Sequence, residues 1–212
     1  MILLLSIMGG AATGALRARL GGREFASPHL RRTWLVPVAF LPQWLAFVLP
    51  ATRRLVTIDL AAAALITSQM MLLMFIWLNR QEPGFRFLAI GAVMNLTVIA
   101  LNGGLMPISP DTVARLLPGA SPDAWHIGAR FGHSKDIILL ASATRLEWLS
   151  DRFTLCAPVP PQWRGAFSLG DVMIAAGAFD ALWTLGGEPQ PMVKRNENVS
   201  LESIHRRFVR PW

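Results

Sequence analysis

The chain has 212 residues, of which 53% are hydrophobic and 16% are charged, with a formal net charge of +7. A charged fraction well below the roughly 25% of an average soluble domain is typical of a protein that spans a membrane. Most of the basic residues lie beside apolar segments, which indicates membrane topology rather than nucleic-acid binding, and the single Cys156 excludes an internal disulfide.

The first two apolar segments predict transmembrane helices. Residues 1–16 would form a helix of about 24 Å, and its arginines follow the apolar run, which favours an uncleaved span over a signal peptide. The loop to residue 32 carries five Arg and one acid, so we expect it on the cytoplasmic side and the N-terminus outside. Residues 33–52 predict a second span, kinked at Pro37 and Pro42, whose freed carbonyls need partners from neighbouring helices.

Three further spans are predicted at 60–78, 87–101 and 168–187. Asn95 lies within the fourth span, where a side-chain amide usually bonds a neighbouring helix rather than a ligand. Asp180 lies within the last span, where an acid is costly and is either functional or paired with an Arg.

The predicted outer loop, residues 102–167, joins the fourth and fifth spans. Within it, Ser109-Pro110-Asp111 predicts the start of a short helix that ends near Gly119. Residues 134–153 predict an element that lies in the membrane interface.

After the last span, residues 188–212 predict a basic cytoplasmic tail whose apolar residues follow helical spacing, as in a helix on the inner leaflet or on a partner. The predicted fold is therefore an all-α membrane protein of about five transmembrane helices. Residues 1–187 form one domain with a long extracytoplasmic loop between the last two spans. The expected location is the inner membrane, with the N-terminus outside and the C-terminus in the cytoplasm.

Two acids are candidates for chemistry. Ser168 and Asp171 have the spacing of a capping box, in which each side chain satisfies a free backbone amide at the start of a helix. Alternatively, Asp171 pairs with Asp151, so that one carboxyl keeps its proton while the other activates water and hydrolyses an amide without a metal. Asp151 beside Arg152 also fits a surface ion pair.

No metal site is predicted from the sequence, and the sequence leaves the identity of any cofactor open. His126 and His133 are seven residues apart, with Asp136 and Cys156 as further possible ligands, but this pattern matches no known metal-ligand spacing.

Several short motifs resemble an uncharacterised family of bacterial integral-membrane proteins. They are Asn102-Gly103-Gly104 with Met106-Pro107, Thr144-Arg145-Leu146, Asp151, and Ser168-x-Gly170-Asp171 with Gly177. The resemblance covers most of the chain from the third span onward, and it implies several spans and no assigned activity.

A fainter resemblance covers residues 145–185. Asp151-Arg152-Phe153, followed 20 residues later by Asp171 in Phe167-Ser168-Leu169-Gly170-Asp171, is similar to the end of lipoprotein signal peptidases. It implies two catalytic aspartates at the outer membrane face, although Ser168 and Gly170 replace the Asn and Ala of that family.

Two functions of different classes follow. The leading prediction is an accessory or scaffold subunit that contacts the lipid bilayer and other membrane proteins and binds no nucleic acid. The alternative is an aspartyl hydrolase that uses Asp151 and Asp171, supported by Asn102, Gly103, Gly104, Arg145 and Ser168. Small-solute transport is less favoured, because the chain shows no inverted repeat.

Overall fold

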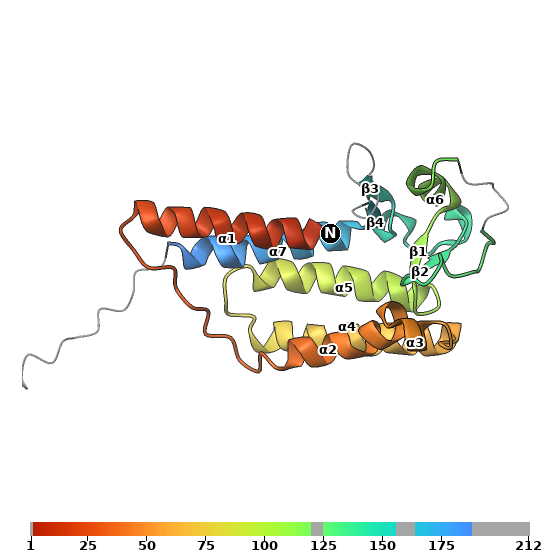
Figure 1. Ribbon diagram of the computed structural model, residues 1–212, viewed down its shortest axis with the longest axis horizontal. Coiled ribbons are helices and arrows are strands. Elements are labelled where there is room, and N and C mark those ends of the chain that lie inside the picture. The colour runs from red at the N-terminus through yellow and green to blue at the C-terminus, as the bar shows by residue number, and fades with distance from the viewer. Residues whose placement is uncertain (1, 120–124, 156–163, 188–212) are drawn as a thin grey trace, which may run out of the picture.

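The computed structural model describes residues 2–119, 125–155 and 164–187. The predicted tail and Cys156 lie outside these residues. The described chain is mostly helical, and its long helices run side by side (Figure 1). They are α1 (Ile2–Leu20), α2 (Leu35–Gln43), α4 (Ile58–Leu78), α5 (Phe85–Leu101) and α7 (Leu169–Leu185).

The long helices contact one another in the order α1, α7, α5, α4, α2, and we call this arrangement the row; α2 and α4 overlap in the view of Figure 1. Each of the three inner helices therefore packs mainly against two of the other long helices. The last helix in the sequence lies between the first helix and α5. Large apolar side chains remain exposed on this row, such as Met74 at 57% and Trp77 at 64%.

Glycines set the spacing on both sides of α7. A Cβ added to Gly10 of α1 would lie 2.9 Å from the carbonyl oxygen of Phe179, and one added to Gly177 would lie 2.6 Å from the carbonyl oxygen of Gly84. Small residues at such positions let helix backbones approach closely, which is a common way of packing helices in lipid.

Two of the helices, α1 and α4, are long and apolar enough to cross a membrane. The apolar segments Leu35–Val48 and Phe85–Leu101 are shorter. The charges of Arg17 and Arg19 lie within the last turn of α1, so this helix extends beyond the predicted 1–16.

The segment predicted as a kinked second span, 33–52, is not one continuous helix. Helix α2 passes into a π-helical turn, η1 (Trp44–Val48), and Leu49 is extended with ψ of 116°. A four-residue helix, α3 (Pro50–Arg53), follows. Pro42 has no N–H for the helix ladder, so it weakens the helix just before the π turn.

Side chains form hydrogen bonds with two backbone carbonyls near this break. The hydroxyl of Ser68 in α4 donates to the carbonyl oxygen of Ala39 at 2.5 Å and accepts from Nε2 of Gln43 at the same distance. The hydroxyl of Thr52 donates to the carbonyl oxygen of Leu45.

The residues after α5 form a cap at one end of the row, which we define as the described residues from 102 to 167. The N-terminal end of α1 and the start of α7 lie at this same end (Figure 1). The cap contains α6 (Pro110–Leu116), which confirms the predicted short helix, and Ser109 caps it by accepting from the amide of Thr112 at 3.2 Å.

Four short strands in the cap were not predicted. β1 (Met106–Ile108) pairs in parallel with β2 (Asp136–Ile138), and β3 (Phe153–Leu155) pairs antiparallel with β4 (Gly165–Phe167). Residues 134–153 therefore contain β2 and two 3-10 turns, η3 (Ala141–Ala143) and η4 (Glu147–Leu149), rather than one continuous element. Ile138 is only 1% exposed because it packs in the core of the cap.

Candidate functional site

Asn102 joins α5 to the cap. Its Nδ2 donates to the carbonyl oxygens of Val98 at 2.8 Å and Arg145 at 2.9 Å, and its Oδ1 accepts from the amide of Arg145 at 2.9 Å. One buried amide thus ends the helix and holds a backbone segment 43 residues away. The predicted supporting residue Arg145 takes part through its backbone, while its side chain is exposed.

The two glycines after Asn102 have different structural roles. Gly103 and Gly104 both have positive φ, 84° and 88°, a region that L-residues with a Cβ rarely adopt. A Cβ at Gly103 would meet nothing within 4 Å, whereas a Cβ at Gly104 would lie 2.6 Å from Cβ of Ala62 in α4. Gly104 therefore also allows the turn to approach α4.

The strand after this turn positions Asp151. The carbonyl oxygen of Pro107 in β1 accepts from the amide of Asp151 at 3.0 Å, and β2 begins on the other side of β1 with Asp136 opposite Met106. β1 thus brings Asp151 and the Lys135-Asp136 pair together on the side of the cap that faces the helices.

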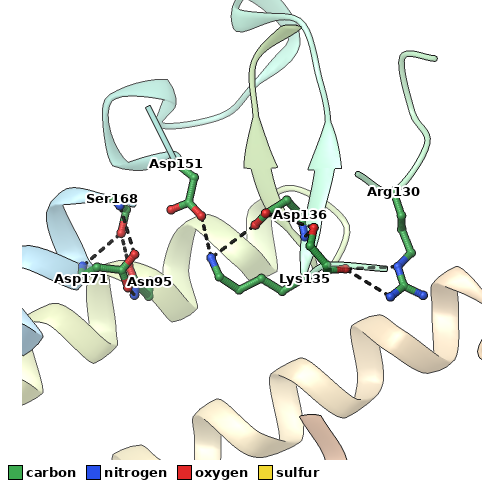
Figure 2. Close-up of polar contacts among 8 residues, drawn as sticks. Asn95, Arg130, Lys135, Asp136, Asp151, Ser168 and Asp171 are labelled. Atoms are coloured by element: carbon green, nitrogen blue, oxygen red, sulfur yellow. Dashed lines mark hydrogen bonds and ion pairs between the residues drawn. The ribbon is translucent and has the colours of Figure 1, made fainter. Parts of the chain in front are cut away.

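Lys135 is bound by two carboxylates in this place (Figure 2). Its Nζ lies 2.6 Å from Oδ2 of Asp151 and 3.3 Å from Oδ1 of Asp136. Asp151 is 1% exposed, and its Oδ1 has no hydrogen-bond partner among the described residues. The sequence-based alternative of an ion pair between Asp151 and Arg152 is wrong, because Arg152 pairs with Glu147 at 3.2 Å.

The cluster holds more negative than positive charge. Burial raises the pKa of Asp151 to about 7; the Lys135 ammonium opposes this shift, while Asp136 and Asp171 add to it. Burial alone would lower the pKa of Lys135, but the three carboxyls outweigh burial and raise it, so the ammonium stays charged. Asp151 is therefore able to exchange a proton near neutral pH.

Asp171 belongs to a second polar network, between α5 and α7 (Figure 2). The hydroxyl of Ser168 accepts from the amide of Asp171 at 3.1 Å, and Oδ2 of Asp171 accepts from the amide of Ser168 at 3.1 Å, which confirms the predicted capping box. Asn95 closes the network: its Nδ2 donates to Oδ1 of Asp171 at 2.8 Å, and its Oδ1 accepts from the Ser168 hydroxyl at 2.9 Å.

Gly170 makes this contact possible. A Cβ at residue 170 would lie 2.0 Å from Oδ1 of Asn95, so only a glycine lets the side-chain amide of Asn95 reach the N-terminal end of α7. The Ser168-x-Gly170-Asp171 motif thus combines a helix cap with space for a buried partner, and Asn95 bonds a neighbouring helix as predicted.

Asp151 and Asp171 lie in adjacent but separate networks. No hydrogen bond joins the two carboxyls within the described chain, and both oxygens of Asp171 accept hydrogen bonds from other groups. Asp171 nevertheless lies close enough for its charge to affect the pKa of Asp151. Sequence reasoning missed Lys135, although it directly precedes Asp136 in a chain with very few lysines.

Among the described residues, no group of three His, Cys, Asp or Glu side chains is arranged to hold a metal ion. Instead, the cap contains a lysine held by two carboxylates, next to the network that caps α7.

The protein is thus a row of apolar helices with a small cap at one end, and the cap holds a lysine-carboxylate cluster on the side that faces the helices. The chain belongs to a family of unknown function (DUF5317), whose pattern matches residues 27–183. An uncharacterized protein of Thermotoga maritima is 34% identical over 115 residues, which cover 52% of this chain and 56% of the relative. The chain thus matches little more than half the length of this curated relative. No solved structure matches the chain.

Proposed function

We propose that this protein is an accessory or scaffold subunit of the inner membrane. In this proposal its five long helices span the bilayer, with the N-terminus and the cap outside and the C-terminal tail in the cytoplasm. The row of helices supports this proposal, because its helices leave many large apolar side chains exposed to lipid or to other membrane proteins. Successive long helices are connected at alternate ends of the row, which agrees with this topology (Figure 1).

The observation that carries the proposal is the position of Asp180 on α7. Gly177 and Ala181 face α5, whereas Phe179 and Leu182 face α1. At 100° per residue, Asp180 lies on neither of these sides but on one open face of the row. Its carboxylate makes no hydrogen bond or ion pair with any described residue.

A carboxylate on an open helix face is costly in lipid, by about 2.5–3.5 kcal/mol at the centre of a membrane helix. A partner helix that offers a Lys, an Arg or a side-chain amide would remove this cost. The partner that the open face fits is therefore a transmembrane helix with a basic or amide side chain at the depth of Asp180.

Copurification tests this proposal. Asp180→Ala should lose a partner that the unchanged protein retains in mild detergent, while Val172→Ala, at another exposed site on α7, should retain it. A photo-crosslinking residue at Ala176, one turn from Asp180, should capture the same partner. A stable monomer with no captured protein in either experiment would contradict the scaffold role.

A second candidate function is hydrolysis with Asp151 and Asp171 at the outer membrane face. The specific observation in its favour is the unpartnered Oδ1 of Asp151 together with its pKa of about 7, which suits proton transfer. In this role Asp171 would have to exchange its bonds to Asn95 and Ser168 for a water molecule.

The hydrolase candidate predicts that Asp151→Asn and Asp171→Asn each abolish cleavage of a lipid-modified peptide while the helical circular dichroism is retained. Unchanged cleavage in Asp171→Asn would exclude the aspartate pair, and loss of helical structure would assign Asp171 to the helix cap alone.

A further inference from the structure

Exposed arginines gather at the end of the row opposite the cap. They belong to the end of α1, to the connection between α1 and α2, to the turn between α4 and α5 and to the start of α5 (Figure 1). These seven exposed residues, which we call the arginine rim, are Arg17, Arg19, Arg23, Arg31, Arg32, Arg80 and Arg86. The acids in the same segments are Glu24 and Glu82, so this end carries an excess of positive charge.

Two arginines of the rim meet at the end of α7. Nη1 of Arg23 donates to the carbonyl oxygen of Gly187 at 2.7 Å. The guanidinium of Arg17 lies against the same glycine, because a Cβ at residue 187 would lie 2.4 Å from Cζ of Arg17. Two guanidinium groups beside one residue repel each other, and an anion between them would remove this repulsion.

Most N–H groups of this pair have no acceptor within the described chain. Arg23 uses one N–H for Gly187, while Arg17 forms no hydrogen bond and no ion pair with a described residue. Cζ of Arg17 instead lies over the ring of Trp183, 5.0 Å from its centroid, a contact that provides no oxygen acceptor. Both arginines are exposed, so a ligand can reach their N–H groups, and planar guanidinium donors match the oxygens of a phosphate.

Tryptophans accompany the arginines at this end of the row. Helix α4 repeats the arrangement of α7, because Cζ of Arg80 lies 4.6 Å from the ring centroid of Trp77. Tryptophan rings favour the level at which the hydrocarbon of a membrane meets the headgroups, and long basic side chains extend from there into the headgroup layer. In the proposed membrane-spanning arrangement, Arg17 and Arg23 therefore lie among the headgroups of the inner leaflet.

We propose that Arg17 and Arg23 bind the phosphate of one anionic phospholipid at the end of α7. The phosphate lies between the two guanidinium groups, and an acyl chain follows the exposed apolar side of α1 past Leu16. The inference rests on the proposed membrane-spanning function, because only then does the arginine rim meet the inner leaflet. An anionic lipid fits better than a zwitterionic one, since the rim attracts net negative charge.

Native mass spectrometry of the full chain in detergent tests the proposal, with dioleoyl phosphatidylglycerol and dioleoyl phosphatidylcholine as probes. One arginine near an anionic lipid changes its affinity by about fivefold. Arg17→Gln and Arg23→Gln should therefore each reduce the preference for phosphatidylglycerol by about this factor, and the double variant should reduce it further. Arg17→Lys, which keeps the charge but loses the planar donors, should give an intermediate preference.

Arg19→Gln is the matched control. Arg19 is exposed in the same last turn of α1, but at 100° per residue it lies on a different side of the helix from Arg17. This variant should keep the preference for phosphatidylglycerol. Equal losses in Arg17→Gln and Arg19→Gln would overturn the inference, because the net charge of the rim would then explain the preference.

Two further results would also overturn the lipid site. One is an unchanged preference in the double variant of Arg17 and Arg23 that retains the helical circular dichroism. The other is displacement of the lipid by inorganic phosphate, because the site would then be one for a free anion.

Alkaline carbonate extraction separates the two proposals. Release of the protein from membranes would refute the membrane-spanning function and the inference that rests on it. Retention in the membrane without a preference for phosphatidylglycerol would refute only the lipid site.

Discussion

Asn79 and Asn102 end consecutive helices with the same three hydrogen bonds. Nδ2 of Asn79 donates to the carbonyl oxygens of Phe75 at 2.8 Å and Arg31 at 3.0 Å, and its Oδ1 accepts from the amide of Arg31 at 2.7 Å. Asn102 repeats this pattern at the end of α5. Because α4 and α5 are antiparallel, the two asparagines hold loops at opposite ends of the row.

Asn102→Ala should lower the free energy of unfolding by about 1–3 kcal/mol, because it leaves buried backbone groups of Arg145 without partners. Asn79→Ala should have an effect of similar size, through Arg31. Thermal unfolding in detergent, followed by circular dichroism, would measure both. Thr97→Ala, at an exposed threonine of α5, is the control and should stay within about 0.5 kcal/mol of the unchanged protein. An equally small effect of Asn102→Ala would show that water replaces the amide.

Gly103→Ala and Gly104→Ala should differ in their effect on stability. Both place a Cβ on a residue with positive φ, which costs about 1–2 kcal/mol. Gly104→Ala adds a clash with Ala62 of α4, so its free energy of unfolding should be lower than that of Gly103→Ala. Ala62→Gly should restore part of the difference in a double variant. Equal stabilities for the two alanine variants would mean that α4 moves aside freely.

Ser168→Ala should cost about 1 kcal/mol or more, because it removes the N-cap of α7 and also the hydrogen bond to Oδ1 of Asn95. Ser168→Asn can still cap the helix but does not fit beside Asn95, so it should recover only part of the loss. Urea unfolding in mild detergent would measure these differences. Full recovery of stability in the Ser168→Asn variant would show that the contact with Asn95 contributes little.

The stability of the protein should depend on the protonation of Asp151. Its pKa rises from 3.8 to about 7 on folding, so the folded state holds the proton more tightly than the unfolded chain does. The contribution of Asp151 to stability is therefore largest at acidic pH and falls as the pH rises from about 4 to about 7.

Asp151→Asn should flatten this dependence, since the amide does not titrate. Lys135→Met should shift it to higher pH, because the ammonium is the group that lowers the pKa of Asp151. Melting temperatures across this pH range, compared among the three proteins, would measure the effect. Parallel curves for Asp151→Asn and the unchanged protein would assign the pH dependence to other groups.

The helices could be predicted from the sequence because their signals are local. Uncharged runs of residues predicted α4 and α5. The spacing of Ser168 and Asp171 predicted the start of α7 to within one turn. The break after Pro42 was harder to predict, because proline is tolerated in membrane helices when neighbours supply hydrogen bonds. Whether Ser68 and Thr52 would do so depends on how the helices pack.

The cap and its lysine-carboxylate cluster could not be predicted from the sequence, for a different reason. Strands of three residues are too short to show alternation, and β1 pairs with a strand almost 30 residues later. Lys135 reaches Asp151 only because both flank β1, so the partner of Asp151 depends on this pairing. Asn95 likewise meets Asp171 only because Gly91 and Gly170 let α5 and α7 approach closely.

The position of α7 between α1 and α5 imposes an order on biosynthesis. Helix α1 is made first, yet its main contact is with the helix that leaves the ribosome last of the five. During translation the glycine-lined side of α1, with Gly10 and Gly14, stays uncovered until α7 arrives. A nascent chain that stops before α7 would therefore expose the glycine-lined side of α1. Cellular quality control could recognise this exposed side as a sign of an incomplete protein.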